Sequence, residues 1–95
     1  MKLESDVIII GAGPVGCVLA HKITKELKLN CLILEKRNHI AGNCYDEYNS
    51  KGLLYHKYGP HYLRFKNKQT LKYLSNFTKW IKGDYIVKSV IKNKL

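Results

Sequence analysis

A short apolar run followed at once by three closely spaced glycines limits the folds open to this chain more than any other feature. Residues 7–10 are Val-Ile-Ile-Ile, a β-branched run typical of a buried parallel strand. Gly11, Gly13 and Gly16 then have the G-x-G-x-x-G spacing. In this motif the first glycine allows a tight turn and the second lets the backbone approach a pyrophosphate. The third lets the following helix pack on the strand.

An acidic residue stands where this motif requires one. Residues 31–34 form a second apolar run, and Glu35 ends it, 19 residues after Gly16. An acid about 20 residues beyond the glycines accepts hydrogen bonds from a ribose in dinucleotide-binding folds. The pattern therefore predicts a dinucleotide site. The alternative is a glycine-rich turn that only packs a helix on a strand, and Pro14 fits either because proline is tolerated in the first helical turn.

Helical periodicity fills the interval between the two apolar runs. Apolar side chains recur at helical spacing and predict one buried face on a helix over residues 14–28: Val15, Val18, Leu19, Ile23 and Leu27. Strands at about 6–10 and 30–35 complete a parallel βαβ unit. The expected fold class is α/β, with a Rossmann-like dinucleotide-binding architecture.

The remainder of the chain has weaker signals. Residues 36–62 lack helical periodicity and predict a long functional loop with short strands, one of them near 53–55. Asn67 is a typical N-cap, and apolar spacing predicts a second helix over 68–80. A turn at 83–84 precedes an expected extended strand over 85–91. At 95 residues the chain holds at most one small domain, and we expect an incomplete one because complete dinucleotide-binding domains are usually larger.

The net charge of +10, from 17 basic and 7 acidic residues, raises the question of nucleic acid or an anionic membrane surface. The lysines are scattered, and Arg37 and Arg64 are the only arginines, whereas base readout favours arginine. We expect a lysine-rich solvated surface around an anionic-ligand site, with no nucleic acid or membrane partner. The apolar stretch 7–20 is too short to span a bilayer, which needs about 20 residues.

Cysteine and histidine spacing gives no sign of a disulfide frame or a metal site. Cys17, Cys31 and Cys44 are odd in number and form no C-x-x-C motif, which predicts reduced thiols in a cytoplasmic protein. The histidines show no metal-ligand spacing with His61, and His21 is expected on the surface of the first helix.

Two longer blocks resemble a known family. Residues 35–45 read Glu-Lys-Arg-Asn-His-Ile-Ala-Gly-Asn-Cys-Tyr, and residues 56–61 read His-Lys-Tyr-Gly-Pro-His. With the glycine motif, they make nearly the whole chain resemble the N-terminal FAD-binding part of UDP-galactopyranose mutase. The resemblance implies a flavoenzyme that interconverts UDP-galactopyranose and UDP-galactofuranose. In that family reduced flavin attacks the anomeric carbon through N5 and forms a flavin–sugar adduct, which is nucleophilic catalysis by the cofactor.

The resemblance also implies roles for particular residues. Gly11, Gly13, Val15 and Gly16, with Pro14 among them, would line the FAD pyrophosphate turn. Glu35, with Lys36 beside it, would hold the adenosine ribose. Gly42 and Asn43 would approach the pyrophosphate or the ribityl chain, and His61 and Tyr62 would lie near the isoalloxazine. No catalytic side chain or metal ligand is assigned, because flavin N5 is the expected nucleophile.

The chain departs from the family pattern at two positions. Ala41 stands where the family has glycine, and alanine does not easily adopt a positive φ. Arg64 stands where the family has a second histidine near the flavin. The residues that bind UDP-galactose in the whole enzyme are expected outside these 95 residues, so we expect the chain alone to be inactive.

Three alternatives stay open at this point. The chain could belong to another flavoprotein with two dinucleotide folds, such as an amine oxidase relative. It could instead be a non-catalytic, degenerate nucleotide-binding protein, or a basic module that binds nucleic acid. Homo-oligomerisation is also left open.

Overall fold

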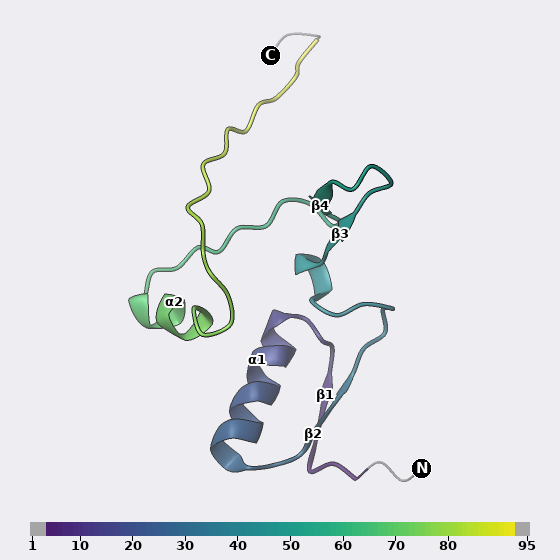
Figure 1. Ribbon diagram of the computed structural model, residues 1–95, viewed down its shortest axis with the longest axis vertical. Coiled ribbons are helices and arrows are strands. Elements are labelled where there is room, and N and C mark those ends of the chain that lie inside the picture. The colour runs from purple at the N-terminus through teal and green to yellow at the C-terminus, as the bar shows by residue number, and fades with distance from the viewer. Residues whose placement is uncertain (1–3, 93–95) are drawn as a thin grey trace. The chain divides into compact units, whose positions relative to one another are not determined.

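The computed structural model describes residues 4–92 and divides the chain into two compact units, Met1–His61 and Tyr62–Leu95. Figure 1 traces both units along the chain.

The first unit contains the predicted βαβ arrangement. Strand β1 spans Val7–Ile10, helix α1 spans Pro14–Lys22, and strand β2 spans Cys31–Leu34. The two strands are parallel, with Val7 opposite Cys31, and α1 runs beside them (Figure 1). Among the residues that the structure describes, the buried core is small and consists of Ile9, Ala12 and Ala20. The predicted α/β class and the parallel strand pair are confirmed.

The predicted helix over 14–28 is helical as far as Leu27, but its last part is not an α-helix. Residues Ile23–Leu27 form a π-helix, a wider turn in which hydrogen bonds skip one more residue. Lys28 then adopts a left-handed conformation, with φ of 59°, and ends the helix. Hydrophobic periodicity cannot distinguish these two kinds of turn, because both place apolar side chains on roughly the same side.

The predicted buried face of this helix is wrong in part. Val15 is 81% exposed, and Leu19 and Leu27 are also exposed. The sheet side is equally open, since Ile10 is 88% exposed and Ile8 is exposed with it. Two strands cover only a narrow strip of an apolar helix, and parallel sheets are normally covered on both faces. The fold is therefore an incomplete Rossmann-like unit.

A hairpin follows the βαβ unit. A single 3₁₀ turn, η2, spans Gly42–Cys44, and strands β3 (Asp46–Tyr48) and β4 (Leu54–His56) pair antiparallel. The turn between them is held by the Asn49 side chain, whose Oδ1 accepts hydrogen bonds from the backbone N–H groups of Lys51 and Leu53. The expected short strand near 53–55 is thus present, shifted by one residue.

The second unit has one helix, α2, over Lys68–Leu74. The Asn67 side chain accepts a hydrogen bond from the Gln69 N–H, which confirms the predicted N-cap. The helix is shorter than the predicted 68–80. The Ser75 hydroxyl bonds back to the Leu71 carbonyl at its C-terminal end, a local bond that competes with the helical pattern.

The expected strand over 85–91 is also absent as a regular element. The segment runs as an extended trace in Figure 1, and within the described residues it forms no strand, with a single-residue bridge at Ile91. Its apolar side chains, including Ile86 and Val87, are exposed. A strand needs a neighbour for its backbone groups, and apolar composition alone does not supply one.

None of the helices formed by residues 4–92 has the length and apolar character that a membrane-spanning helix needs.

Candidate dinucleotide-binding site

The glycine motif forms a tight turn directly after β1. Gly11 has φ of 102°, a conformation that glycine adopts readily, and its N–H donates to the Leu34 carbonyl at 2.7 Å. A Cβ atom added at Gly16 would lie 2.0 Å from the Gly11 carbonyl oxygen. The first and third glycines therefore have the structural roles that the motif predicts, turning the chain and allowing the helix to approach it.

The N-terminus of α1 opens directly from this turn. Gly13 is the N-cap residue and Pro14 occupies the first turn, and no side chain caps this end. The first-turn N–H groups of an α-helix have no intrahelical acceptor, and together they carry a partial positive charge. Val15 and Gly16 stand in this turn, so their backbone is placed to bind an anion.

The second glycine of the motif meets the loop after β2. Gly42 has φ of 57°, and a Cβ atom added there would lie 3.2 Å from the Gly13 Cα. The Ala41 N–H donates to the Ala12 carbonyl at 2.8 Å, which ties this loop to the turn. Two backbone segments without side chains thus face each other. The structure thus brings Gly42 next to the glycine motif.

The Glu35 carboxylate links the turn to the end of β2. One oxygen, Oε2, accepts the Ala12 N–H at 2.7 Å, and Oε1 accepts the Arg37 N–H at 2.8 Å. The Arg37 N–H, followed by that of Ala12, holds the pKa of this carboxyl below its ordinary value of 4.5. Each carboxylate oxygen can accept a second hydrogen bond, so the group braces the turn and still retains acceptor capacity.

Asn43 is oriented by a contact that the sequence did not predict. Its Oδ1 accepts a hydrogen bond from Arg37 Nη2 at 3.0 Å, and the Arg37 guanidinium lies 4.5 Å from the centre of the Tyr58 ring. Tyr58 in turn bonds to His39, which stacks on Tyr45 at 3.9 Å between ring centres. These contacts fix the loop that carries Gly42 and Asn43. In the sequence, the only indication of this cluster was the presence of aromatic residues near Arg37 and Asn43.

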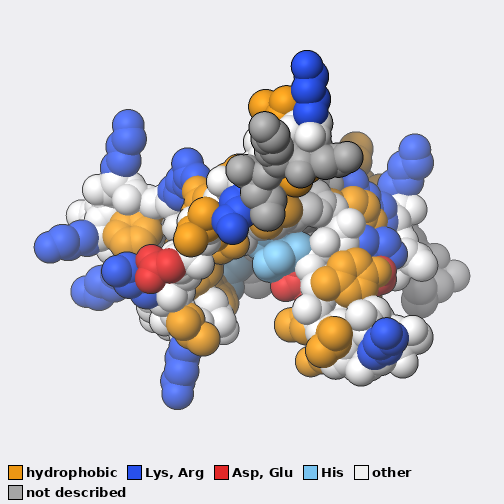
Figure 2. Space-filling model, turned by 90° about the horizontal axis from the view of Figure 1, so that it is seen from above, with side chains coloured by type: hydrophobic (Ala, Val, Ile, Leu, Met, Phe, Trp, Pro, Cys, Tyr) orange, Lys and Arg blue, Asp and Glu red, His pale blue; other side chains and the backbone are white. Residues whose placement is uncertain are grey.

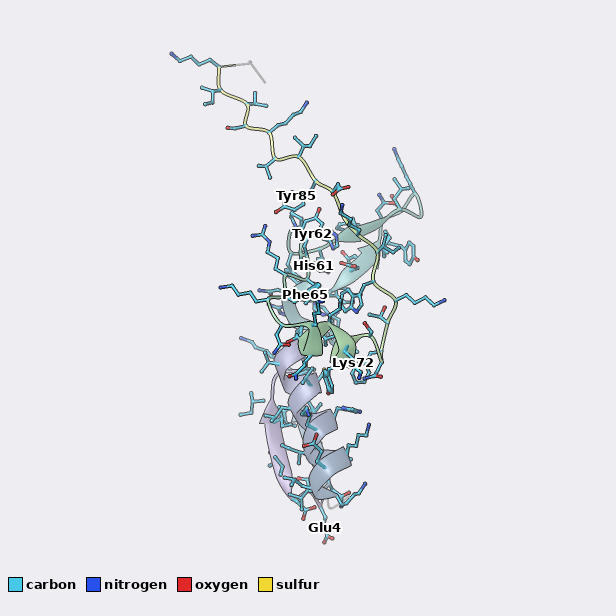
Figure 3. All side chains as sticks on the ribbon, turned by 90° about the vertical axis from the view of Figure 1, so that its left-hand side faces the viewer. Glu4, His61, Tyr62, Phe65, Lys72 and Tyr85 are labelled. Atoms are coloured by element: carbon cyan, nitrogen blue, oxygen red, sulfur yellow. The ribbon has the colours of Figure 1, made fainter. Side chains whose placement is uncertain are left out.

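The two residues expected near a flavin ring lie in different units. In the first unit, His61, which is labelled in Figure 3, lies close to Asp46 and His56. In the second unit, Tyr62 stacks on Tyr85 at 4.5 Å between ring centres, and Arg64 donates to the Tyr85 hydroxyl. The structure therefore brings together the glycines and Glu35, while Tyr62 belongs to a separate aromatic pair.

The remaining predicted contact residues lie at the surface. Lys36 is exposed, as are Val15 and Asn43. Lysine and arginine side chains project singly from the face shown in Figure 2 instead of gathering in one patch. The second unit has an open hollow of about 440 Å³ lined mainly by aromatic and aliphatic side chains, among them Tyr62, Leu71 and Trp80.

Comparison with known proteins finds relatives among sugar mutases. The chain is 42% identical over 91 residues to a UDP-galactopyranose mutase of Mycoplasma genitalium. The aligned residues cover 95% of this chain and 22% of that relative. A UDP-galactopyranose mutase of Mycoplasma pneumoniae is 42% identical over 76% of the chain and 18% of its own length. A dTDP-fucopyranose mutase of Escherichia coli is 36% identical over 75% of the chain and 19% of its own length.

These findings confirm the resemblance to UDP-galactopyranose mutases. The chain spans about a fifth of the length of the curated relatives it matches. The model of the NAD(P)-binding Rossmann-like domain matches residues 9–77, which include the glycine turn, Glu35 and the second glycine loop. By its sequence match and by its parallel βαβ unit, the chain belongs to the NAD(P)-binding Rossmann-like domain family.

Proposed function

We propose that this chain forms part of the FAD-binding region of a UDP-galactopyranose mutase. The observation that carries the proposal is the approach of Gly42 to Gly13 at the uncapped N-terminus of α1. The names of the relatives support the mutase assignment, and the family match supports a dinucleotide cofactor. We propose FAD as this cofactor and sugar ring interconversion as the reaction of the whole enzyme.

The residues present fit such a cofactor. Gly13 and Gly42 leave the space that two side chains would otherwise fill, so a diphosphate can reach the backbone N–H groups directly. Glu35 stands at the end of β2 with acceptor capacity for ribose hydroxyls. The site thus offers donors to the anionic centre of the cofactor and an acceptor to its sugar.

Each part of the chain has a distinct task in this proposal. The first turn of α1 binds the diphosphate, with Gly11, Gly13, Pro14, Val15 and Gly16 around it. Glu35 and Lys36 hold the adenosine ribose, and Gly42 and Asn43 approach the diphosphate or the ribityl chain. His61 and Tyr62 are proposed to lie against the isoalloxazine. Reduced FAD, when bound, supplies N5 as the nucleophile toward the anomeric carbon of the sugar.

The substrate of the whole enzyme would be UDP-galactopyranose or UDP-galactofuranose, which differ in the size of the sugar ring. The groups that hold this substrate are proposed to lie in a substrate-binding domain outside the 95 residues. We also propose a cytoplasmic location, because the three cysteines are free thiols. A homo-oligomeric state is compatible with the exposed apolar side chains of β1.

The test is a titration of the purified chain with FAD, NAD⁺ and NADP⁺, followed by flavin fluorescence anisotropy and by competition. We expect FAD to bind at least about tenfold more tightly than either nicotinamide dinucleotide, a difference of about 1.4 kcal/mol. Tight binding of NADP⁺ with no measurable binding of FAD would contradict the proposal and favour a nicotinamide-dependent relative.

Two variants sharpen this test. A Cβ added at Gly13 would meet only the Gly42 Cα, at 3.9 Å, so Gly13→Ala should fold normally and yet obstruct the diphosphate. Glu35→Ala should weaken FAD binding about ten- to a hundredfold, because it removes a charged hydrogen-bond acceptor. Lys25→Ala is the control, since it removes an exposed side chain at the opposite end of the first helix from the glycine turn. Equal FAD affinity in all three variants would show that the flavin does not use this turn.

A further inference from the structure

A carboxylate and two imidazoles converge at one end of the hairpin. Asp46 begins β3 and His56 ends β4, and the strand pairing places these two residues directly opposite each other. His61 reaches the same point five residues later, after a turn in which Gly59 has φ of 95° and is followed by Pro60. The three side chains together offer one ligand atom each, all within 4.8 Å of one another.

The three ligand atoms form a compact triangle with edges of different length. His56 Nδ1 lies 2.8 Å from Asp46 Oδ1 and 3.1 Å from His61 Nε2. The third edge, from His61 Nε2 to Asp46 Oδ1, is 3.5 Å. Each atom is therefore close to both of the others, so the contacts do not form a linear chain.

Hydrogen bonds between the residues cannot satisfy all three contacts at once. A neutral imidazole nitrogen carries either one proton or one lone pair. If His56 Nδ1 donates its proton to the Asp46 carboxylate, it has no lone pair left for His61. A single N–H also points along only one edge of the triangle, so the second edge is strongly bent. A cation at the centre would instead accept a lone pair from all three atoms at once.

We propose that Asp46, His56 and His61 form a binding site for a divalent transition-metal ion of the zinc type. Zinc binds imidazole nitrogen and carboxylate oxygen at about 2.0–2.2 Å, and tetrahedral geometry then separates the ligand atoms by roughly 3.3 Å. The observed edges of 2.8, 3.1 and 3.5 Å bracket this value. Two neutral histidines and one carboxylate are also ligands that zinc accepts in natural sites.

The site is open enough for the ion to enter. Once the ion is bound by the three residues, one coordination position remains for a solvent molecule. The side chains of His56, Asp46 and His61 are 40%, 31% and 30% exposed. Ligation through Nε2 would place the remaining His61 proton on Nδ1, an atom that is buried and has no hydrogen-bond partner among the described residues. The ion would thus fix the tautomer of His61, and its Nδ1–H would need an acceptor from solvent, since a ligating histidine normally donates this second N–H.

The site is tested by titrating the full 95-residue chain with Zn²⁺ in a calorimeter, without flavin, so the outcome is independent of the FAD test. We expect binding of one ion per chain. His56→Ala and Asp46→Asn should each weaken it at least tenfold, whereas His21→Ala on helix α1 should leave it unchanged. Absence of Zn²⁺ binding, or equal affinity in all three variants, would overturn the proposal.

Two further measurements keep the result interpretable. The chain has three free thiols, which also bind zinc, so Co²⁺ is added in place of Zn²⁺ and its absorption recorded. Weak ligand-field bands alone would support the site, and an intense thiolate charge-transfer band would contradict it. NMR of the wild-type chain, which needs no variant to fold, should show zinc-dependent shifts of the ring nitrogens of His56 and His61 but not of His21. Shifts confined to other residues would refute the assignment.

Discussion

At the scale of single residues, the site depends on backbone conformations that most side chains disfavour. Ala41 has φ of 72° and ψ of −3°, although only glycine adopts this left-handed region without cost. Its N–H is nevertheless held by the Ala12 carbonyl, so the second loop keeps its place against the glycine turn. The departure from the family pattern that was noted in the sequence is thus a point of local strain.

We expect Ala41→Gly to raise the free energy of unfolding by up to about 1.6 kcal/mol. Relief of the left-handed alanine gains about 1–2 kcal/mol, and the greater freedom of glycine in the unfolded chain offsets about 0.4–1 kcal/mol. Urea denaturation of both proteins measures the difference. Ala20→Gly in α1 is the matched control and should have the opposite sign, since glycine disfavours a helix. A destabilised Ala41→Gly protein would mean that the loop has another conformation in solution.

Glu35 should make stability depend on pH. Because folding lowers the pKa of this carboxyl, its contribution is fully present above pH 4.5 and is lost as the pH falls through the lowered value. Unfolding midpoints measured from about pH 6 down to about pH 3 should therefore fall more steeply for the wild-type chain than for Glu35→Gln. Parallel curves for the two proteins would show that the Ala12 and Arg37 contacts do not form.

At the scale of elements, the glycine spacing controls how closely α1 approaches β1. Gly16→Ala would place a methyl group 2.0 Å from the Gly11 carbonyl oxygen, and the backbone would have to move. We expect a loss of about 1–3 kcal/mol, although alanine favours a helix by about 1 kcal/mol. Gly13→Ala should leave stability nearly unchanged, and thermal unfolding of both variants makes the comparison. Equal melting temperatures would mean that helix and turn are farther apart than described.

The sequence predicted those elements whose cause is local. The strand at Val7–Ile10, the glycine turn, the strand at Cys31–Leu34 and the Asn67 cap all follow from residues adjacent in the chain. The predictions failed where an element depends on residues that are distant in the sequence. The segment 85–91 lacks a regular strand because strand formation needs a neighbour, and Val15 is exposed because two strands cannot cover α1. The meeting of Asp46, His56 and His61 depends on hairpin register, which the sequence pattern did not specify.

At the scale of the whole molecule, the chain buries little apolar surface. Ile9, Ala12 and Ala20 are the buried apolar residues of the described part, while Ile8 and Ile10 face outward from β1. Exposed apolar side chains of this kind favour association. We expect concentration-dependent self-association in sedimentation velocity, reduced by Ile10→Lys. Lys25→Ala, which changes a charged helix residue, is the control, and a monodisperse monomer at all concentrations would contradict the expectation.

The same molecule should not catalyse sugar ring interconversion by itself. Positioning a substrate against its catalytic group contributes about 7–11 kcal/mol of a barrier, and the proposed substrate-binding domain lies outside these residues. Incubation with UDP-galactofuranose, FAD and dithionite should yield UDP-galactopyranose only at the rate of a no-protein control. Faster formation that depends on the protein would show that the minimal catalytic unit is smaller than proposed.

The contact between Gly13 and Gly42 makes the two positions mutually dependent. A methyl group at Gly13 would meet the Gly42 Cα at 3.9 Å, and one at Gly42 would meet the Gly13 Cα at 3.2 Å. If both residues carry a methyl group, the two groups compete for the same gap, so the combined cost should exceed the sum of the single costs. Whether a larger residue is tolerated at one of these positions therefore depends on which residue occupies the other. Once a substitution has enlarged Gly13 or Gly42, a second substitution that enlarges its neighbour is disfavoured.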